Sequence, residues 1–244
     1  RQQPKHKKMA NLITRQIPNT ITCCNLVSGC IAVSYAFEGL YATAFLFIVI
    51  GAVFDFFDGM SARLLEVSSP IGKELDSLAD CITFGLAPSA IIYTFLSTQS
   101  WLELVPVVGR YVPYAAFVIA AFSALRLAKF NLDERQTTSF IGMPTPANAL
   151  FWASLIVGSE GWLSSSPWTV AAVVVMVFVC SWLLVAEIPM FALKFKKWGW
   201  RGNELKYVFI ATSVVLLAVF RLSGFAAVVA WYVLLSVLSN RNKA

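Results

Sequence analysis

The chain has 244 residues, of which 58% are hydrophobic and only 13% are charged. A soluble domain carries about 25% charged residues, so this composition excludes an ordinary soluble enzyme, a disordered tail and a collagen-like fibre. A transporter, a channel, a membrane-embedded enzyme and a membrane scaffold all stay open. The formal net charge is +6, and the charges lie between long apolar runs. We therefore expect them to meet acidic lipid headgroups rather than nucleic acid.

The first 17 residues form a basic segment with an amphipathic pattern. Four apolar residues recur there at helical spacing: Met9, Leu12, Ile13 and Ile17. This pattern predicts a short interfacial helix whose basic face meets anionic lipid, and a flexible basic anchor is the alternative. We expect residues 1–17 to precede a single transmembrane domain over residues 18–240.

Apolar runs long enough to cross a bilayer fill the remainder of the chain. A spanning helix needs about 20 apolar residues, within a range of about 17–25. The sequence predicts an all-α integral membrane protein with about eight transmembrane helices, near residues 20–37, 40–62, 75–97, 111–130, 145–162, 168–192, 206–220 and 222–239. The last two share one nearly continuous apolar run. Arg221 and Gly224 favour a tight turn there over one long tilted helix.

The distribution of charge predicts the orientation of these helices. With the N-terminus in the cytoplasm, every lysine and arginine except Arg110 and Arg221 lies in or beside a cytoplasmic segment. The outer connections hold Glu38, Glu103 and Glu160 instead. This arrangement follows the positive-inside rule and requires an even number of spans, because both ends of the chain are basic. We expect a protein of the cytoplasmic (inner) membrane with both termini in the cytoplasm.

Four aspartates near the cytoplasmic ends of the second and third predicted spans indicate the chemistry. Asp55 and Asp58 are three residues apart, and Asp76 and Asp80 are four apart, so each pair shares one helix face. The short connection makes the two helices antiparallel neighbours, and their acidic faces can converge. Carboxylates this close to hydrocarbon need compensation by protonation or by bound cations.

The type of ligand decides which cation this site would bind. Hard oxygen ligands suit Mg²⁺ or Mn²⁺, and two such ions about 4 Å apart form a clamp for phosphoryl chemistry. The only histidine, His6, lies in the polar N-terminal segment, and no CxxC motif occurs, so we expect no zinc site. The sequence therefore predicts a site for two divalent cations.

Small and basic residues accompany the aspartates. Gly59, Ala62 and Gly72 lie near the acidic faces and leave room for a flat or bulky ligand, although close helix packing is an equal alternative. Arg63 can hold a phosphate bidentately, or it can extend to the interface or pair with Asp58. Asp76 and Asp80 lie about two to three turns past the connection, so we expect a site just inside the inner headgroup layer, where a lipid-linked pyrophosphate can reach it. A transporter site would lie nearer the midplane.

The spacing of these residues resembles the signature of the CDP-alcohol phosphotransferase family. The pattern is D-x-x-D-G-x-x-A-R, eight residues, then G-x-x-x-D-x-x-x-D. Its defined positions are Asp55, Asp58, Gly59, Ala62, Arg63, Gly72, Asp76 and Asp80. The resemblance implies that the four aspartates hold two divalent cations, Mg²⁺ or Mn²⁺, with Asp80 as candidate general base. It also implies a homodimer and a CDP-diacylglycerol pocket formed by Asp58, Gly59, Ala62, Arg63 and Gly72, with Asn19 and Thr20 from the start of the first span.

Two further stretches resemble the phosphatidylserine synthase branch of this family: residues 124–131 and 140–147. This branch implies transfer of a phosphatidyl group from CDP-diacylglycerol to the hydroxyl of L-serine, with release of CMP. Arg126, Lys129 and Asn131 are the candidate serine-binding residues. Positive-inside anchoring is the alternative for the two cations, and for Lys129 it is the favoured one. The Pro144-Thr145-Pro146 stretch predicts the start of a helix, because proline suits the first turn.

Three rival functions stay open at the level of sequence. The same family chemistry could use another acceptor, such as glycerol 3-phosphate, an inositol phosphate or an aminoalcohol. A cation transporter would use the aspartates to bind its ion, but it would explain neither Arg63 nor the glycine spacing. A purely structural membrane protein would leave four intramembrane aspartates as an unexplained energetic cost.

Overall fold

The computed structural model describes residues 5–67, 69–132, 140–191, 199 and 203–241. The chain is an all-α integral membrane protein, and the regular β structure among these residues is one two-residue antiparallel pairing of β1 (Phe140–Ile141) with β2 (Pro189–Met190). The longer helices are α1 (Lys5–Phe37), α2 (Tyr41–Leu64), α3 (Pro70–Asp80), α4 (Ala87–Ser97), α6 (Phe117–Leu132), α7 (Thr145–Leu163), α8 (Pro167–Val185), α9 (Glu204–Phe220) and α10 (Gly224–Arg241). Short helical turns connect them: η1 (Cys81–Leu86), η2 (Ser100–Leu104), α5 (Pro106–Gly109), η3 (Val112–Ala116) and η5 (Arg221–Ser223).

Six helical segments among the described residues are long and apolar enough to cross a membrane. They are Gln16–Phe37, Tyr41–Leu64, Pro70–Ser97, Val112–Leu132, Pro167–Val185 and Glu204–Ser239. The last segment contains both α9 and α10, which are separated by the predicted turn, where Arg221 has a positive φ of 51°. Helix α7 has 19 residues but is more polar than these six segments. The number of eight spans therefore stays a prediction.

Two ends of the predicted helices can be compared directly with the structure. Helix α7 begins at Thr145 with Pro146 in its first turn, which confirms the predicted start. The predicted helix over 168–192 is wrong at its end, because α8 stops at Val185. Ala186 already has an extended ψ of 139°, and Pro189, which cannot donate a helical hydrogen bond, pairs in β2 instead.

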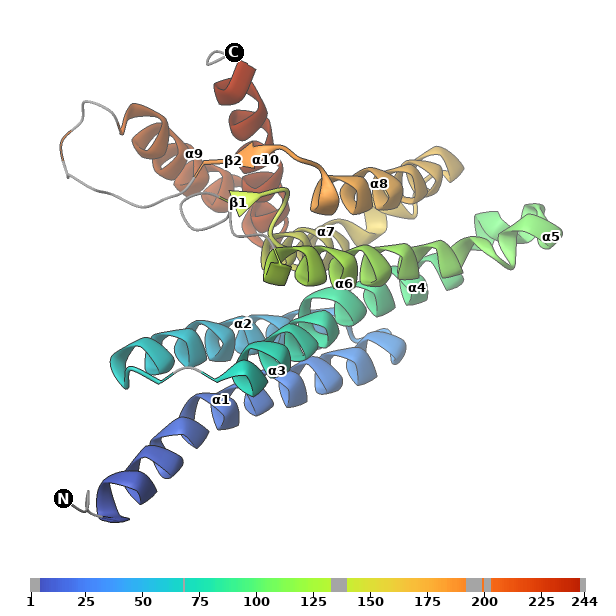
Figure 1. The fold of residues 1–244 in the computed structure, drawn as a ribbon. Coiled ribbons are helices and arrows are strands. Elements are labelled where there is room, and N and C mark those ends of the chain that lie inside the picture. Colours follow the sequence, from blue (N-terminus) through green and yellow to red (C-terminus); the bar gives the residue numbers. More distant parts are fainter. Residues whose placement is uncertain (1–4, 68, 133–139, 192–198, 200–202, 242–244) are drawn as a thin grey trace.

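The basic N-terminal segment continues into the first span. Helix α1 runs without a break from Lys5 to Phe37, with Pro18 inside it, and projects from one end of the bundle in Figure 1. The interfacial role of residues 1–17 and the domain division at residue 17 stay predictions.

The first four long helices build the part of the bundle that carries the acidic residues. Helices α1 and α2 pack along each other, and α3, η1 and α4 lie against α1 (Figure 1). Their buried core includes Ile48, Phe84 and Phe95, and it extends to Trp152 of α7. A second apolar cluster around Phe209 joins α9 and α10 to the β1–β2 region.

A π-helical turn, η1, follows Asp80 in the third span. Pro88 explains it, because proline has no N–H to donate and its ring would clash with the carbonyl of Phe84 four residues earlier. The chain accommodates this with a wider turn, which is a common feature of functional sites. Helix α4 then continues to Ser97.

Thr83 of η1 is the point where α1, α2 and the third span touch. Its Oγ1 donates a hydrogen bond to the backbone oxygen of Asn25 at 3.1 Å. A Cβ atom placed on Gly29 would lie 2.8 Å from the Cα of Thr83, and one on Gly51 would also clash with the Thr83 side chain. The two glycines therefore permit the close approach that holds these three elements together beside Asp80.

Candidate active site

Three of the four predicted aspartates converge between α2 and α3. Asp55, Asp76 and Asp80 each offer a carboxylate oxygen, and these oxygens lie within 4.8 Å of one another. Asp55 and Asp76 are partly buried, and Asp80 is buried. We call these residues the carboxylate trio.

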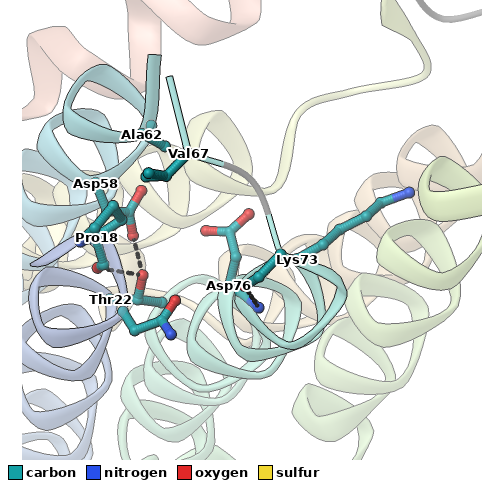
Figure 2. A pocket seen from close by; sticks show the side chains of 11 residues that line it. Pro18, Thr22, Asp58, Ala62, Val67, Lys73 and Asp76 are labelled. Carbon is teal, nitrogen blue, oxygen red and sulfur yellow. Dashed lines mark hydrogen bonds between the residues drawn. The ribbon is translucent and has the colours of Figure 1, made fainter. Parts of the chain in front are cut away.

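Asp58 lies apart from the trio and is held by helix α1. Its Oδ2 accepts a hydrogen bond of 2.6 Å from Thr22 Oγ1, which also donates to the backbone oxygen of Pro18 at 3.0 Å. Figure 2 shows the Asp58 and Asp76 side chains on opposite sides of a pocket, one from α2 and one from α3. Asp58 thus links the acidic site to α1.

This pocket has a volume of about 210 Å³ and lies between the middle of α1, the last turns of α2 and the start of α3. Its lining residues are Pro18, Asn19, Thr22, Asp58, Gly59, Ala62, Val67, Ser69, Gly72, Lys73 and Asp76. The Lys73 side chain extends away from Asp76 (Figure 2), and its Nζ donates to the backbone oxygen of Asn131 at 2.8 Å. The pocket therefore has a carboxylate on each of two opposite sides, and several of its other lining residues are small.

Most of the residues predicted to bind the nucleotide lie in this pocket, and two do not. Asn19, Asp58, Gly59, Ala62 and Gly72 line it. Arg63 and Thr20 are not among the lining residues.

Each of these two residues has a clear position elsewhere. Arg63 is an exposed residue in the last turn of α2. Thr20 is also exposed, and its Oγ1 donates to the backbone oxygen of Gln16 at 2.9 Å. Both residues are therefore near the pocket in sequence but exposed outside its lining.

The start of α3 fixes the glycine side of the pocket. Ser69 caps the helix, with its Oγ accepting from the backbone N–H of Gly72 at 2.9 Å, and Pro70 occupies the first turn. A Cβ atom on Gly72 would lie 3.0 Å from Asn19 Oδ1, so glycine lets α3 approach α1 closely. The carbonyl oxygen of the Asn19 side chain thereby reaches the pocket wall.

Two polar residues of α1 were missed by the sequence prediction of the site. One is Thr22, which holds Asp58, and the other is Asn25, whose Nδ2 donates to Asp80 Oδ1 at 3.1 Å. Both are buried, and they lie three residues apart on one face of α1. Polar residues inside an apolar span mark functional positions, so this spacing was the signal that could have found them.

The three predicted serine-binding residues have different surroundings. Arg126 is buried, and its Nη1 donates to Thr145 Oγ1 at 3.2 Å. Lys129 is exposed, and Asn131 Nδ2 donates to Ser77 Oγ at 2.8 Å. Of the three residues, Arg126 is the one whose charged side chain is buried inside the protein.

Comparison with known proteins identifies the family. The family model described as CDP-alcohol phosphatidyltransferase matches residues 15–182, which is more than half of the chain. The chain belongs to the CDP-alcohol phosphatidyltransferase family. The match includes the carboxylate trio, the pocket and Arg126.

Several curated relatives of this chain have the same name. A Bacillus subtilis protein named CDP-diacylglycerol–serine O-phosphatidyltransferase is 40% identical over 130 residues, which cover 53% of this chain and 69% of the relative. A Mycobacterium tuberculosis protein of that name is 31% identical, with 96% of this chain and 77% of the relative covered. A Helicobacter pylori protein of that name is 28% identical, with 93% and 96% covered.

The carboxylate trio fits the divalent cations on which this family generally depends. The converging ligand atoms are all carboxylate oxygens, which suit hard cations. Asp76 Oδ1 is buried and has no hydrogen-bond partner among the described residues, and neither does Asn25 Oδ1. Buried polar atoms are nearly always paired, so a cation at the trio would supply the partner that Asp76 lacks.

Proposed function

We propose that this membrane enzyme transfers the phosphatidyl group of CDP-diacylglycerol to the hydroxyl of L-serine, giving phosphatidylserine and CMP. The carrying observation is that a trio of carboxylates adjoins a pocket of about 210 Å³ formed by the small residues of the same signature. The name shared by the relatives supports serine as acceptor. The donor lipid keeps its acyl chains in the bilayer while its pyrophosphate enters from the headgroup layer.

We assign two divalent cations, Mg²⁺ or Mn²⁺, to the carboxylates of Asp55, Asp58, Asp76 and Asp80. Bound there, they would polarise the phosphoryl oxygens and stabilise the departing CMP. Thr22 keeps the Asp58 carboxylate turned toward the pocket, since its hydroxyl donates to Oδ2 at 2.6 Å. The nucleotide then lies against Gly59, Ala62 and Gly72.

The reaction itself is a displacement at the lipid-side phosphorus. The serine oxygen forms the new bond to phosphorus, the bond between that phosphorus and the CMP oxygen breaks, and the hydroxyl proton passes to Asp80. Asn25 acts as a positioning residue, because its Nδ2 donates to Asp80 Oδ1 at 3.1 Å and leaves the other carboxylate oxygen for this transfer.

The remaining assignments rest on the family resemblance and on charge. Asn19 contributes to the donor pocket that it lines, whereas Arg63 and Thr20 are assigned to the donor by their place in the motif. The enzyme acts as a homodimer in the cytoplasmic (inner) membrane, with its active site facing the cytoplasm. Membrane lipids surround it, and its basic segments meet their acidic headgroups.

The geometry of the pocket favours this reaction over cation transport. A transported ion needs only a narrow cage of ligands, whereas this pocket of about 210 Å³ is lined by Gly59 and Gly72 as well as by Asp76. An alternative acceptor alcohol would use the same donor site, so an activity assay is needed to distinguish it from serine. Purified protein would be incubated with CDP-diacylglycerol and a panel of alcohols, and CMP release would be followed. Serine should give the highest rate, and no CMP release with any alcohol would reject the proposal.

Gly59→Ala is expected to leave the fold intact and to raise the apparent KM for CDP-diacylglycerol about tenfold. A Cβ atom on Gly59 would meet nothing within 4 Å, and alanine favours a helix over glycine. The methyl group therefore obstructs only the ligand, and overpacking costs about 1–3 kcal/mol. Steady-state CMP release measures this change.

Gly161→Ala is the matched control, because a Cβ atom on Gly161 of α7 would also meet nothing within 4 Å and this residue lies outside the pocket. An unchanged KM in Gly59→Ala would show that the donor does not use this wall.

Arg126→Lys is expected to raise the KM for serine about ten- to hundredfold, with little change for CDP-diacylglycerol. Lysine keeps the charge but loses the planar fork, and a hydrogen bond to a charged group contributes about 1.5–3 kcal/mol. Arg126→Ala should raise the KM for serine further. With ethanolamine, which lacks the carboxylate, wild type and variant should behave alike. A rise in the KM for CDP-diacylglycerol alone would assign Arg126 to the donor site instead.

A further inference from the structure

Four buried polar side chains lie on α6 and α7 near the hydrogen bond that joins Arg126 to Thr145. Ser123 and Arg126 come from α6, and Thr145 and Asn148 come from α7. Arg126 is 8% exposed, and the other three are fully buried. Arg126 Nη1 contacts Thr145 Oγ1 at 3.2 Å, and Asn148 lies one helical turn beyond Thr145 on the same face of α7. We call these residues the α6–α7 polar cluster.

The hydrogen bonding of this cluster is incomplete. Arg126 Nε, Ser123 Oγ and both polar atoms of the Asn148 side chain have no partner among the described residues. Because Asn148 Oδ1 and Nδ2 are both unpaired, exchanging the two atoms would not change this result. Buried polar groups in native proteins nearly always have a partner, so the cluster is suited to a ligand or water.

The α6–α7 polar cluster lies beside the reaction site. Ser123 packs on η1, since a Cβ atom on Gly85 would lie 3.1 Å from the Cβ of Ser123. Turn η1 begins directly after Asp80, and helix α6 packs along this turn. A small molecule bound to the cluster would therefore be next to the residue proposed to accept the hydroxyl proton.

The unpaired atoms define the chemistry of this molecule. Arg126 Nε and Asn148 Nδ2 are donors, which suit a carboxylate, and the N-terminal end of α7 favours the same negative charge. Asn148 Oδ1 is an acceptor and needs a donor. A fully ionised phosphate has only acceptor oxygens, whereas the ammonium group of an α-amino acid supplies the donor.

We infer that Asn148 is a specificity-determining residue for a zwitterionic acceptor: its Nδ2 donates to the carboxylate bound by Arg126, and its Oδ1 accepts from the adjacent ammonium. This inference rests on the proposed function and adds a residue that the sequence motifs did not indicate. It also gives a role to a buried side-chain amide whose two polar atoms have no partner among the described residues.

The test compares acceptors in wild type and in Asn148→Leu, which keeps the volume and removes both polar atoms. The KM for L-serine should rise at least tenfold, while the KM for CDP-diacylglycerol should stay within twofold. The preference for L-serine over 3-hydroxypropionate, which lacks the ammonium, should largely disappear. Asn148→Asp, which keeps the shape but removes the donor, should also raise the serine KM and serves if the leucine variant does not fold.

Trp152→Phe is the matched control, because Trp152 lies one turn deeper on α7 and its buried Nε1 also lacks a partner among the described residues. Its serine KM should stay near that of wild type. An unchanged serine KM in an active Asn148 variant would overturn the inference, assign the cluster to buried water and leave the proposed function intact. A rise in the KM for CDP-diacylglycerol alone would also overturn it. Wild-type protein that releases no CMP with serine would reject the proposed function and the inference with it.

Discussion

Asp76→Asn is expected to lower turnover at least about a thousandfold while the protein keeps its fold. Asp76 belongs to the carboxylate trio and also lines the pocket, so it joins the cation site to the donor site. Asparagine keeps the size of the side chain but loses the charge that holds a cation. The measurement is CMP release by variant protein that still elutes as a monodisperse detergent complex.

Glu74→Gln provides the matched control for this experiment. Glu74 is an exposed carboxylate on the same helix, two residues away, and belongs to neither the trio nor the pocket lining. Its activity should equal that of wild type. Near-wild-type activity in Asp76→Asn would contradict the cation site. Asp55→Asn should lower turnover as Asp76→Asn does.

Removal of divalent cations is expected to abolish activity, and Mg²⁺ or Mn²⁺ should restore it. The reason is that the trio presents oxygen ligands only, and like charges so close together need a counter-charge before an anionic pyrophosphate can approach. The protein would be treated exhaustively with EDTA, its metal content measured, and CMP release followed during add-back. Full activity in metal-free protein would reject the mechanism.

A zinc-selective chelator distinguishes the proposed cations from a contaminating metal. The described cysteines are all free, and the proposed ligands include neither thiol nor imidazole. Activity should therefore survive removal of zinc. A loss that only zinc reverses would point to different ligands.

Local patterns in the sequence predicted the helices and the converging carboxylates. The spacing of Asp76 and Asp80 places them on one face of one helix, and a short connection brings that helix against its neighbour. The start of α7 was predictable from Pro146, because proline constrains the chain locally. In both cases the information lies within a few residues.

Contacts between distant segments could not be read from these patterns. Asp58 lies outside the trio, and its carboxylate accepts a hydrogen bond from Thr22, 36 residues earlier. Arg126 resembled a cation at the membrane surface, but Thr145 of another helix holds it in the interior. Pro189 limits the length of α8 locally, but the pairing of residues 189–190 with residues 140–141 lies beyond the reach of a local pattern.

The π-helical turn η1 divides the third span into two halves, α3 and α4, whose side chains are rotated differently about the helix axis. On the α3 side of this turn, Asp76 and Asp80 converge with Asp55, and on the α4 side Ile91 and Phe95 are fully buried in the core. Each residue of an α-helix advances the side-chain direction by about 100°. Deleting one residue from η1 would therefore turn the aspartates by this angle relative to the anchored half, away from Asp55. The wide turn therefore sets the rotation of α3 relative to α4. The aspartates of α3 can point toward the reaction site while the apolar residues of α4 point into the core.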